Sequence, residues 1–186
     1  MRVIAGKYRS RTLKSVPGKE TRPTYDRLKE TLFNVLQAAG KLEGAAFLDL
    51  FAGTGAIGVE ALSRGAAVVH FVELNRKAAR VIQENLESLG ITEGVEVLDV
   101  NADEALIALE RRGIEFDICF LDPPYQMQGI YEQTLRLLAS GSVLKDGGVV
   151  IAEHEKRFDP GDGYGKLARY RKLEQGESSL SFYRKG

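Results

Sequence analysis

The stretch Asp122-Pro123-Pro124-Tyr125 places a carboxylate, stiff backbone carbonyls and an aromatic ring within four consecutive residues. It follows the apolar run Phe116–Leu121, and a strand must end there because proline has no backbone N–H to donate. In open α/β sheets, ligands bind at the carboxyl ends of the strands. The four residues suit a planar NH2-bearing group, whose hydrogens would meet acceptors while the ring stacks on its face. The same residues are equally compatible with an ordinary strand-ending turn.

A glycine-rich loop, Asp49-Leu50-Phe51-Ala52-Gly53-Thr54-Gly55-Ala56-Ile57-Gly58, supplies a second set of candidate residues. Its three glycines have the G-x-G-x-x-G spacing, and the loop stands between a predicted strand and a predicted helix, as in nucleotide-binding sites. Glycine permits a tight turn and the close approach of a ligand to the backbone. The loop therefore predicts a site for a nucleotide-like cofactor.

Polar residues at the ends of the next two predicted strands extend this site. Glu73 could accept hydrogen bonds from both hydroxyls of a ribose, and Leu74 follows it. Asn101-Ala102-Asp103 ends the third strand, where a polar group could reach an adenine edge. Asp103 is explained equally well as the N-cap of the following helix.

Two cofactors fit these residues. NAD would place a pyrophosphate on the glycine loop, whereas S-adenosylmethionine has no phosphate and would bring its amino acid moiety there. The carboxylate of Asp49 favours S-adenosylmethionine, because it would repel a pyrophosphate and attract a cationic amino group or sulfonium. With the sulfonium near Asp122, that carboxylate and the Pro123 carbonyl could hold an acceptor amine in line with the methyl group, without a covalent intermediate. The only thiol, Cys119, lies inside a predicted strand, which counts against methylation at a pyrimidine carbon.

The elements that must position these residues alternate between strand and helix. Short apolar runs predict strands, and apolar residues with a 3.6-residue period predict helices. This alternation is typical of an α/β fold with a mainly parallel, doubly wound sheet. The predicted strands are 46–50, 68–72, 95–100, 116–121 and 149–152, and the predicted helices are 24–39, 56–64, 76–89, 103–112 and 130–138. A β-hairpin is predicted at each end, over residues 2–16 and between 167–173 and 180–183.

Length and composition agree with one soluble domain that carries a small extension. The chain has 186 residues, 44% of them hydrophobic and 28% charged, and no apolar run approaches the ~20 residues that span a bilayer. The amino-terminal residues lack the apolar segment of a signal peptide, so the sequence predicts a cytoplasmic protein with no membrane partner. One cysteine excludes an internal disulfide framework, and two distant histidines argue against a metal site.

The charges are distributed unevenly although the formal net charge is zero. Residues 1–29 carry nine Lys or Arg against two acids, residues 156–186 carry eight against four, and residues 30–155 carry nine against twenty. Two basic ends favour a polyanionic partner if they meet in space, and solvated surface charge is the alternative. The candidate RNA-binding residues near the amino terminus are Arg2, Lys7, Arg9, Arg11, Arg22 and Arg27.

The motifs resemble those of the Rossmann-like class I S-adenosylmethionine-dependent methyltransferases. Asp49–Gly55 is similar to their first motif, Glu73 to their ribose-binding acid, and Asp122–Tyr125 to their amino-methyltransferase signature. Over nearly its whole length the chain resembles the RsmD family of bacterial 16S rRNA guanine-N2 methyltransferases, most specifically in Arg22–Asn34. Asn101 departs from the pattern, because an Asp is common at that position.

The resemblance implies a seven-stranded sheet with an antiparallel last strand, an amino-terminal hairpin extension over residues 1–20, and a methyltransferase domain over 21–186. It implies transfer from S-adenosylmethionine to the exocyclic amine of a guanine in 16S rRNA, within an assembling small subunit. The implied catalytic residues are Asp122, Pro123, Pro124 and Tyr125. The implied cofactor-binding residues are Asp49, Phe51, Ala52, Gly53, Thr54, Gly55, Glu73, Leu74, Asn101, Ala102 and Asp122.

Other functions also fit parts of the sequence. Methylation of adenine N6 in DNA or of a protein glutamine amide would use the same planar-amine site, but neither accounts for Arg22–Asn34. A non-catalytic RNA-binding assembly factor would not need an intact glycine loop and Asp-Pro-Pro-Tyr. NAD-dependent oxidoreduction is the least favoured, since no motif for hydride transfer is present.

Overall fold

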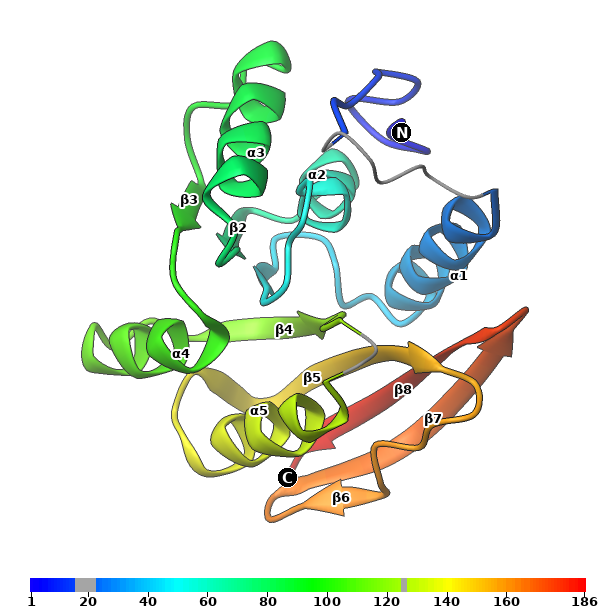
Figure 1. Ribbon diagram of the computed structural model, residues 1–186, viewed down its shortest axis with the longest axis vertical. Coiled ribbons are helices and arrows are strands. Elements are labelled where there is room, and N and C mark those ends of the chain that lie inside the picture. Colours follow the sequence, from blue (N-terminus) through cyan, green and yellow to red (C-terminus); the bar gives the residue numbers. More distant parts are fainter. Residues whose placement is uncertain (16–22, 125–126) are drawn as a thin grey trace.

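The computed structural model describes residues 1–15, 23–124 and 127–186 (Figure 1). Two of the predicted site residues, Arg22 and Tyr125, therefore lie outside the described residues. Within the described part of the chain, no helix is both long enough and apolar enough to cross a membrane.

One mixed sheet of eight strands runs through the molecule in the order β3-β2-β1-β4-β5-β8-β7-β6 (Figure 1). β1 to β5 are mutually parallel, and β8 pairs antiparallel with both β5 and β7. The predictions of a doubly wound sheet and of a terminal hairpin are thus confirmed. The strands are β1 Ala46–Asp49, β2 Val68–Val72, β3 Val95–Leu98, β4 Phe116–Leu121, β5 Leu144–Glu155, β6 Gly163–Tyr164, β7 Leu167–Gln175 and β8 Ser178–Lys185.

The number of strands differs from the predicted seven because of the very short β6. Gly163 and Tyr164 pair antiparallel with Ala168 and Leu167 of β7, across a turn that Gly165 enters with φ +54°. Two residues before a tight turn are too few to show the alternation that predicts a strand.

In the described part of the chain, five helices cover the two faces of the sheet: α1 Pro23–Ala38, α2 Ala56–Ser63, α3 Arg76–Ser88, α4 Ala102–Arg111 and α5 Gln128–Ser140 (Figure 1). Alternate strand residues enter the two cores, as the period of two in a strand requires. Phe47 and Phe120 pack with residues of α1, α2 and α3, whereas Leu48 and Leu121 pack with residues of α4 and α5. The sheet is therefore buried on both faces between two apolar layers.

β5 is longer than the predicted 149–152 in both directions. Leu144 pairs with Phe116 and Val149 with Ile118, so the residues between them form a bulge that contains Gly147, with φ +73°. The two glycines at 147 and 148 thus lie inside the strand rather than before it. At the other end β5 continues past Ala152 to Glu155, because β8 extends the pairing there.

The amino-terminal segment reverses direction as predicted, but forms only one isolated antiparallel bridge, between Arg2 and Thr12. Backbone hydrogen bonds also cross the turn, from the Val3 N–H to the Arg11 oxygen at 3.0 Å and from the Leu13 N–H to the Met1 oxygen at 2.9 Å, while other amides of the segment bind the domain. The backbone N–H groups of Ile4 and Ala5 donate to the Glu60 carboxylate of α2 at 2.8 and 3.0 Å. The short hairpin predicted over 2–16 is therefore present over the described residues 1–15, and it docks on α2.

Candidate active site

The glycine loop lies between the carboxyl end of β1 and the start of α2. Gly53 and Gly55 have φ values of +57° and +79°, a backbone region that residues other than glycine rarely adopt. A Cβ atom on Gly53 would meet nothing within 4 Å, so the space beside its backbone is open. The third glycine acts differently: a Cβ on Gly58 would lie 2.2 Å from Cε1 of Phe71, so Gly58 lets α2 pack closely on β2.

Asp49 stands at the carboxyl end of β1 and is almost completely buried. Its carboxylate accepts a hydrogen bond from the Gly58 N–H at 3.2 Å, which ties the strand to α2. Burial raises the pKa of Asp49 to about 8, against the Gly58 hydrogen bond, and the charges of Asp122 and Glu73 raise this pKa further. Three predicted site acids from three different strands therefore act on one another at the same edge of the sheet.

Glu73 follows β2 and is half-buried. One of its carboxylate oxygens accepts the Gly53 N–H at 2.7 Å, and the other accepts the Asn75 N–H at 2.8 Å. Glu73 thus supports the glycine loop directly, in addition to the ribose-binding role predicted for it. Leu74, the next residue, is 66% exposed and offers an apolar surface beside the loop.

Asn101 is the N-cap of α4, with its side-chain oxygen accepting the Glu104 N–H at 2.8 Å. The alternative role considered for Asp103, as the helix cap, is therefore wrong; Asp103 instead accepts a hydrogen bond from Gln133. Capping uses the oxygen of Asn101 and leaves its NH2 group to meet a ligand acceptor. Ala102 is buried behind it.

Asp122 and the two prolines follow directly after β4, as predicted. Asp122 is half-buried, Pro123 is buried and Pro124 is exposed, and the Pro124 carbonyl accepts the Met127 N–H at 2.9 Å. This hydrogen bond joins Pro124 to the residue that precedes α5. The position of the aromatic ring of Tyr125 stays a prediction, because that residue lies outside the described part.

Glu153 is an acid beside this site that the sequence interpretation did not include. It lies on β5, is 4% exposed, and interacts with Asp122. The register pairs Ala152 with Leu121, so Glu153 continues β5 beside the residue that follows β4. A carboxylate immediately after the apolar run 149–152 was a signal for a strand-end site residue, of the same kind as those at Asp49 and Asp122.

The described residues fit S-adenosylmethionine better than an anionic cofactor. Asp49, Glu73 and Asp122 place three carboxyl groups beside an open glycine backbone, and a cation there would favour their ionised forms. A pyrophosphate would disfavour those ionised forms. Among the described residues, no group of three His, Cys, Asp or Glu is arranged to hold a metal ion.

The amino-terminal segment carries exposed basic side chains next to the glycine loop. Arg2, Lys7, Arg9 and Arg11 are exposed, as is Arg27 at the start of α1. The loop contacts the segment through Thr54, whose hydroxyl donates to the Met1 sulfur at 3.4 Å. The buried Asn85 side chain strengthens this contact, because its NH2 donates to the main-chain oxygens of Thr54 at 3.0 Å and of Lys14 at 3.2 Å.

The segment Arg22–Asn34, which carried the most specific resemblance, has a structural role in its described part. Lys29 of α1 lies 3.4 Å from Glu60 and donates to the main-chain oxygen of Arg2 at 2.9 Å. Arg64 binds Glu60 at 2.7 Å and donates to the side-chain oxygen of Asn34 at 3.1 Å. This buried ion network joins α1, α2 and the amino-terminal segment.

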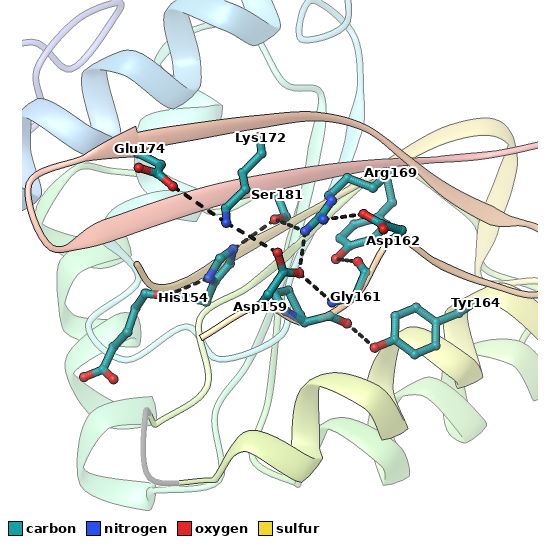
Figure 2. A network of polar contacts seen from close by, with 12 residues as sticks. His154, Asp159, Gly161, Asp162, Tyr164, Arg169, Lys172, Glu174 and Ser181 are labelled. Carbon is teal, nitrogen blue, oxygen red and sulfur yellow. Dashed lines mark hydrogen bonds and ion pairs between the residues drawn. The ribbon is translucent and has the colours of Figure 1, made fainter. Parts of the chain in front are cut away.

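Several basic residues of the carboxyl-terminal end are neutralised within the fold, as Figure 2 shows. Arg169 binds Asp159 at 2.6 Å and also pairs with Asp162. Lys172 lies 3.4 Å from Asp159 and 3.7 Å from Glu174. These ion pairs reduce the positive charge that the carboxyl-terminal end offers to a polyanion, whereas Arg2, Lys7, Arg9 and Arg11 of the amino-terminal segment are exposed.

The chain is similar to known proteins over most of its length. A family model described as Conserved hypothetical protein 95 matches residues 1–184. "Putative rRNA methyltransferase YlbH" of Bacillus subtilis is 38% identical over 185 residues, which cover 100% of this chain and 99% of that protein. "Ribosomal RNA small subunit methyltransferase D" of Haemophilus influenzae is 38% identical over 157 residues, 84% of this chain and 79% of that protein.

A solved structure, "Putative methyltransferase yhhF from Escherichia coli", superposes with a TM-score of 0.83 and 34% identity, covering 100% of this chain and 97% of that one. The family model and both relatives thus extend over most of the chain. The sequence therefore belongs to the RsmD family of S-adenosylmethionine-dependent methyltransferases.

Proposed function

We propose that this methyltransferase modifies the exocyclic N2 of a guanine in 16S rRNA, within an assembling small ribosomal subunit in the cytoplasm. The observation that carries the proposal is the meeting of Asp49, Glu73 and Asp122 beside the glycine loop. Relatives named as small-subunit rRNA methyltransferases support the choice of substrate. Residues 1–20 would be the RNA-facing extension, and residues 21–186 the methyltransferase domain.

S-adenosylmethionine, when bound, supplies an electrophilic methyl group. The glycine loop residues Phe51–Gly55 and the acid Asp49 would hold its amino acid moiety, Glu73 its ribose, and Leu74 with Asn101-Ala102 its adenine. Each of these residues lies at the carboxyl end of β1, β2 or β3, in the loop that follows, or, for Ala102, at the first position of α4. Ligand binding at this edge is the rule for open α/β sheets.

Asp122 and Pro123 would orient the acceptor. The lone pair of a guanine amine is delocalised into the ring, which makes the nitrogen a weak nucleophile. Hydrogen bonds from its two N–H groups to the Asp122 carboxylate and the Pro123 carbonyl would direct the lone pair out of the ring plane. Proximity and orientation of this kind can contribute ~7–11 kcal/mol to the lowering of a barrier.

Asp122 would also receive the proton that the amine must lose, and pass it to water. Pro124 fixes the turn, and Tyr125 would stack on the base, which is typically worth ~1–3 kcal/mol. The exposed Arg2, Lys7, Arg9, Arg11 and Arg27, with Arg22, would bind the phosphates of the surrounding RNA.

The test is a methyl-transfer assay with radiolabelled S-adenosylmethionine. The purified protein is offered small-subunit particles that lack the modification, naked 16S rRNA, DNA and protein. Label is expected in the rRNA of the particles, and nucleoside analysis is expected to identify N2-methylguanosine. Label confined to DNA or protein, or a different methylated nucleoside, would contradict the proposal.

Asp122→Asn tests the assignment within the site. The amide accepts through one oxygen only and cannot take up the proton, so transfer is expected to fall at least about 100-fold while cofactor binding persists. Asp146→Asn is the matched control, because Asp146 is an exposed aspartate in the β5 bulge, near the start of β4 and away from Asp122. Loss of cofactor binding in Asp122→Asn would show that its role is misassigned.

A further inference from the structure

Glu153 is a buried carboxyl group to which the proposed function gives no task. It is 4% exposed and lies on β5, between β4 on one side and β8 on the other. Its neighbour on β8 is Leu180, a core residue. Ile151 and Phe182, the nearby residues on the same face of β5 and β8, are also core residues, so packing alone does not require an acid here.

The strand register places Glu153 beside Asp122. Leu121, the last residue of β4, pairs with Ala152 of β5. The residues that follow this pair are the two acids, Asp122 and Glu153. Phe120 and Ile151 share one core and Leu121 and Ala152 the other. Continued alternation puts both acids on the face covered by α1, α2 and α3.

The environment of Glu153 favours its protonated form. Burial, and then the negative charge of Asp122, raises the pKa of Glu153 well above its ordinary value. On the other packed elements, α5 contributes the Tyr131 hydroxyl, which donates to the main-chain oxygen of Glu153 at 2.7 Å. The following residue, His154, hydrogen-bonds to Ser181 at 2.9 Å.

We propose that Glu153 is a positioning residue for methyl transfer: its carboxyl group donates a hydrogen bond to the Asp122 carboxylate and orients it toward the acceptor amine. The inference rests on the proposed role of Asp122. One Asp122 oxygen would accept the Glu153 proton, and the other would remain for the amine N–H. Two adjacent carboxyl groups that share one proton behave in this way when they cannot both ionise.

The arrangement also preserves the proton balance of the reaction. The proton lost by the methylated amine moves to the Asp122 oxygen that faced it, and from there to water. Glu153 keeps its own proton throughout. The release of the Asp122 proton to water therefore returns the pair to its starting state. Glu153 does not touch the substrate, and its effect is exerted through Asp122.

Two substitutions test the proposal on the rRNA substrate. Glu153→Gln keeps the shape and a hydrogen-bond donor but cannot ionise, and Glu153→Leu removes the donor. Glu153→Leu is expected to lower kcat about 10- to 100-fold, the effect of one lost hydrogen bond to a charged group, with KM for S-adenosylmethionine unchanged. Glu153→Gln is expected to keep kcat within about threefold of the wild type at neutral pH.

The pH profile separates positioning from simple packing. Wild-type kcat is expected to fall as the pH rises through the pKa of Glu153, because the ionised group no longer donates. Glu153→Gln donates at every pH, so this part of the alkaline fall is expected to disappear. Titration of the guanine is common to both proteins and cancels in the comparison.

Normal kcat in a folded Glu153→Leu variant, or an unchanged alkaline fall in Glu153→Gln, would overturn the proposal. If Glu153→Leu does not fold, the pH profile of Glu153→Gln decides. Asp122→Asn is assayed in parallel: full activity in that variant would refute the proposed function itself. An inactive Asp122→Asn together with a normal Glu153→Leu would refute only the role of Glu153.

Discussion

Replacement of Glu60 by Gln should strongly destabilise the fold and detach the amino-terminal segment. The Glu60 side chain is completely buried and holds four donors. It accepts the backbone N–H groups of Ile4 and Ala5 at 2.8 and 3.0 Å, and it pairs with Arg64 at 2.7 Å and Lys29 at 3.4 Å. Gln keeps the shape but removes the charge that compensates two buried cations.

The expected loss follows from those contacts. Removing one partner of a buried ion network typically costs ~3–5 kcal/mol, because the remaining charge stays buried without compensation. Burial already lowers the pKa of Lys29, against the opposing effect of the Glu60 charge, so Lys29 is poorly solvated. A domain has a total stability of about 5–15 kcal/mol, so the change is a large share of it.

The assay is equilibrium unfolding in urea followed by circular dichroism, together with limited proteolysis of residues 1–15. Glu60→Gln should lower the unfolding midpoint and speed cleavage of the amino-terminal segment. Glu87→Gln, an exposed glutamate on α3, is the control and should change the stability by less than about 0.5 kcal/mol.

A second substitution checks the cause. In Glu60→Gln combined with Lys29→Met, one of the two uncompensated cations is gone, so part of the lost stability should return. Two results would refute the reasoning. One is a Glu60→Gln protein whose free energy of unfolding is within about 1 kcal/mol of the wild-type value. The other is a double variant whose loss of stability equals the sum of the losses caused by each substitution alone.

Three further outcomes are expected. Gly58→Ala should lower the free energy of unfolding by about 1–3 kcal/mol in a thermal or urea titration, because its Cβ would overlap the Phe71 ring, and Phe71→Leu should offset part of that loss. Binding of S-adenosylmethionine should release a proton and become tighter as the pH rises toward about 8, because a bound cation lowers the raised pKa of Asp49. Calorimetry in two buffers with different ionisation enthalpies measures this proton release. The substitution Asp49→Asn should abolish the release. The Cys119 thiol is buried, with its pKa raised by burial, so it should react with a thiol reagent only in denaturant; reaction in the native protein at the unfolded rate would contradict its placement.

Local patterns in the sequence were sufficient to predict most elements and the positions of the site residues along them. β2 and β4 have the predicted bounds, and α3 differs from prediction by one residue. Apolar runs mark strands that are buried on both faces, and glycine and proline mark their ends. Asp49, Glu73 and Asp122 could be recognised for this reason, since each closes such a run.

Predictions failed where the partner of a segment decided its structure. β5 gained its length from pairing with β4 and β8. The predicted amino-terminal hairpin pairs over only a few residues, and Glu60 of α2 binds two of its amides. Neither partner is close in sequence, so no local pattern could show the outcome.

The sequence by itself thus determined the order of the elements, the doubly wound class of the sheet and the glycine loop, because these depend on periodicity and backbone restrictions within a few residues. Only the tertiary structure decided which charges meet. Register brought Glu153 beside Asp122, and Asp159, in the loop between β5 and β6, neutralised Arg169 and Lys172 of β7. Electrostatic interactions depend on separation and burial in space, and these are properties of the packed chain rather than of any segment.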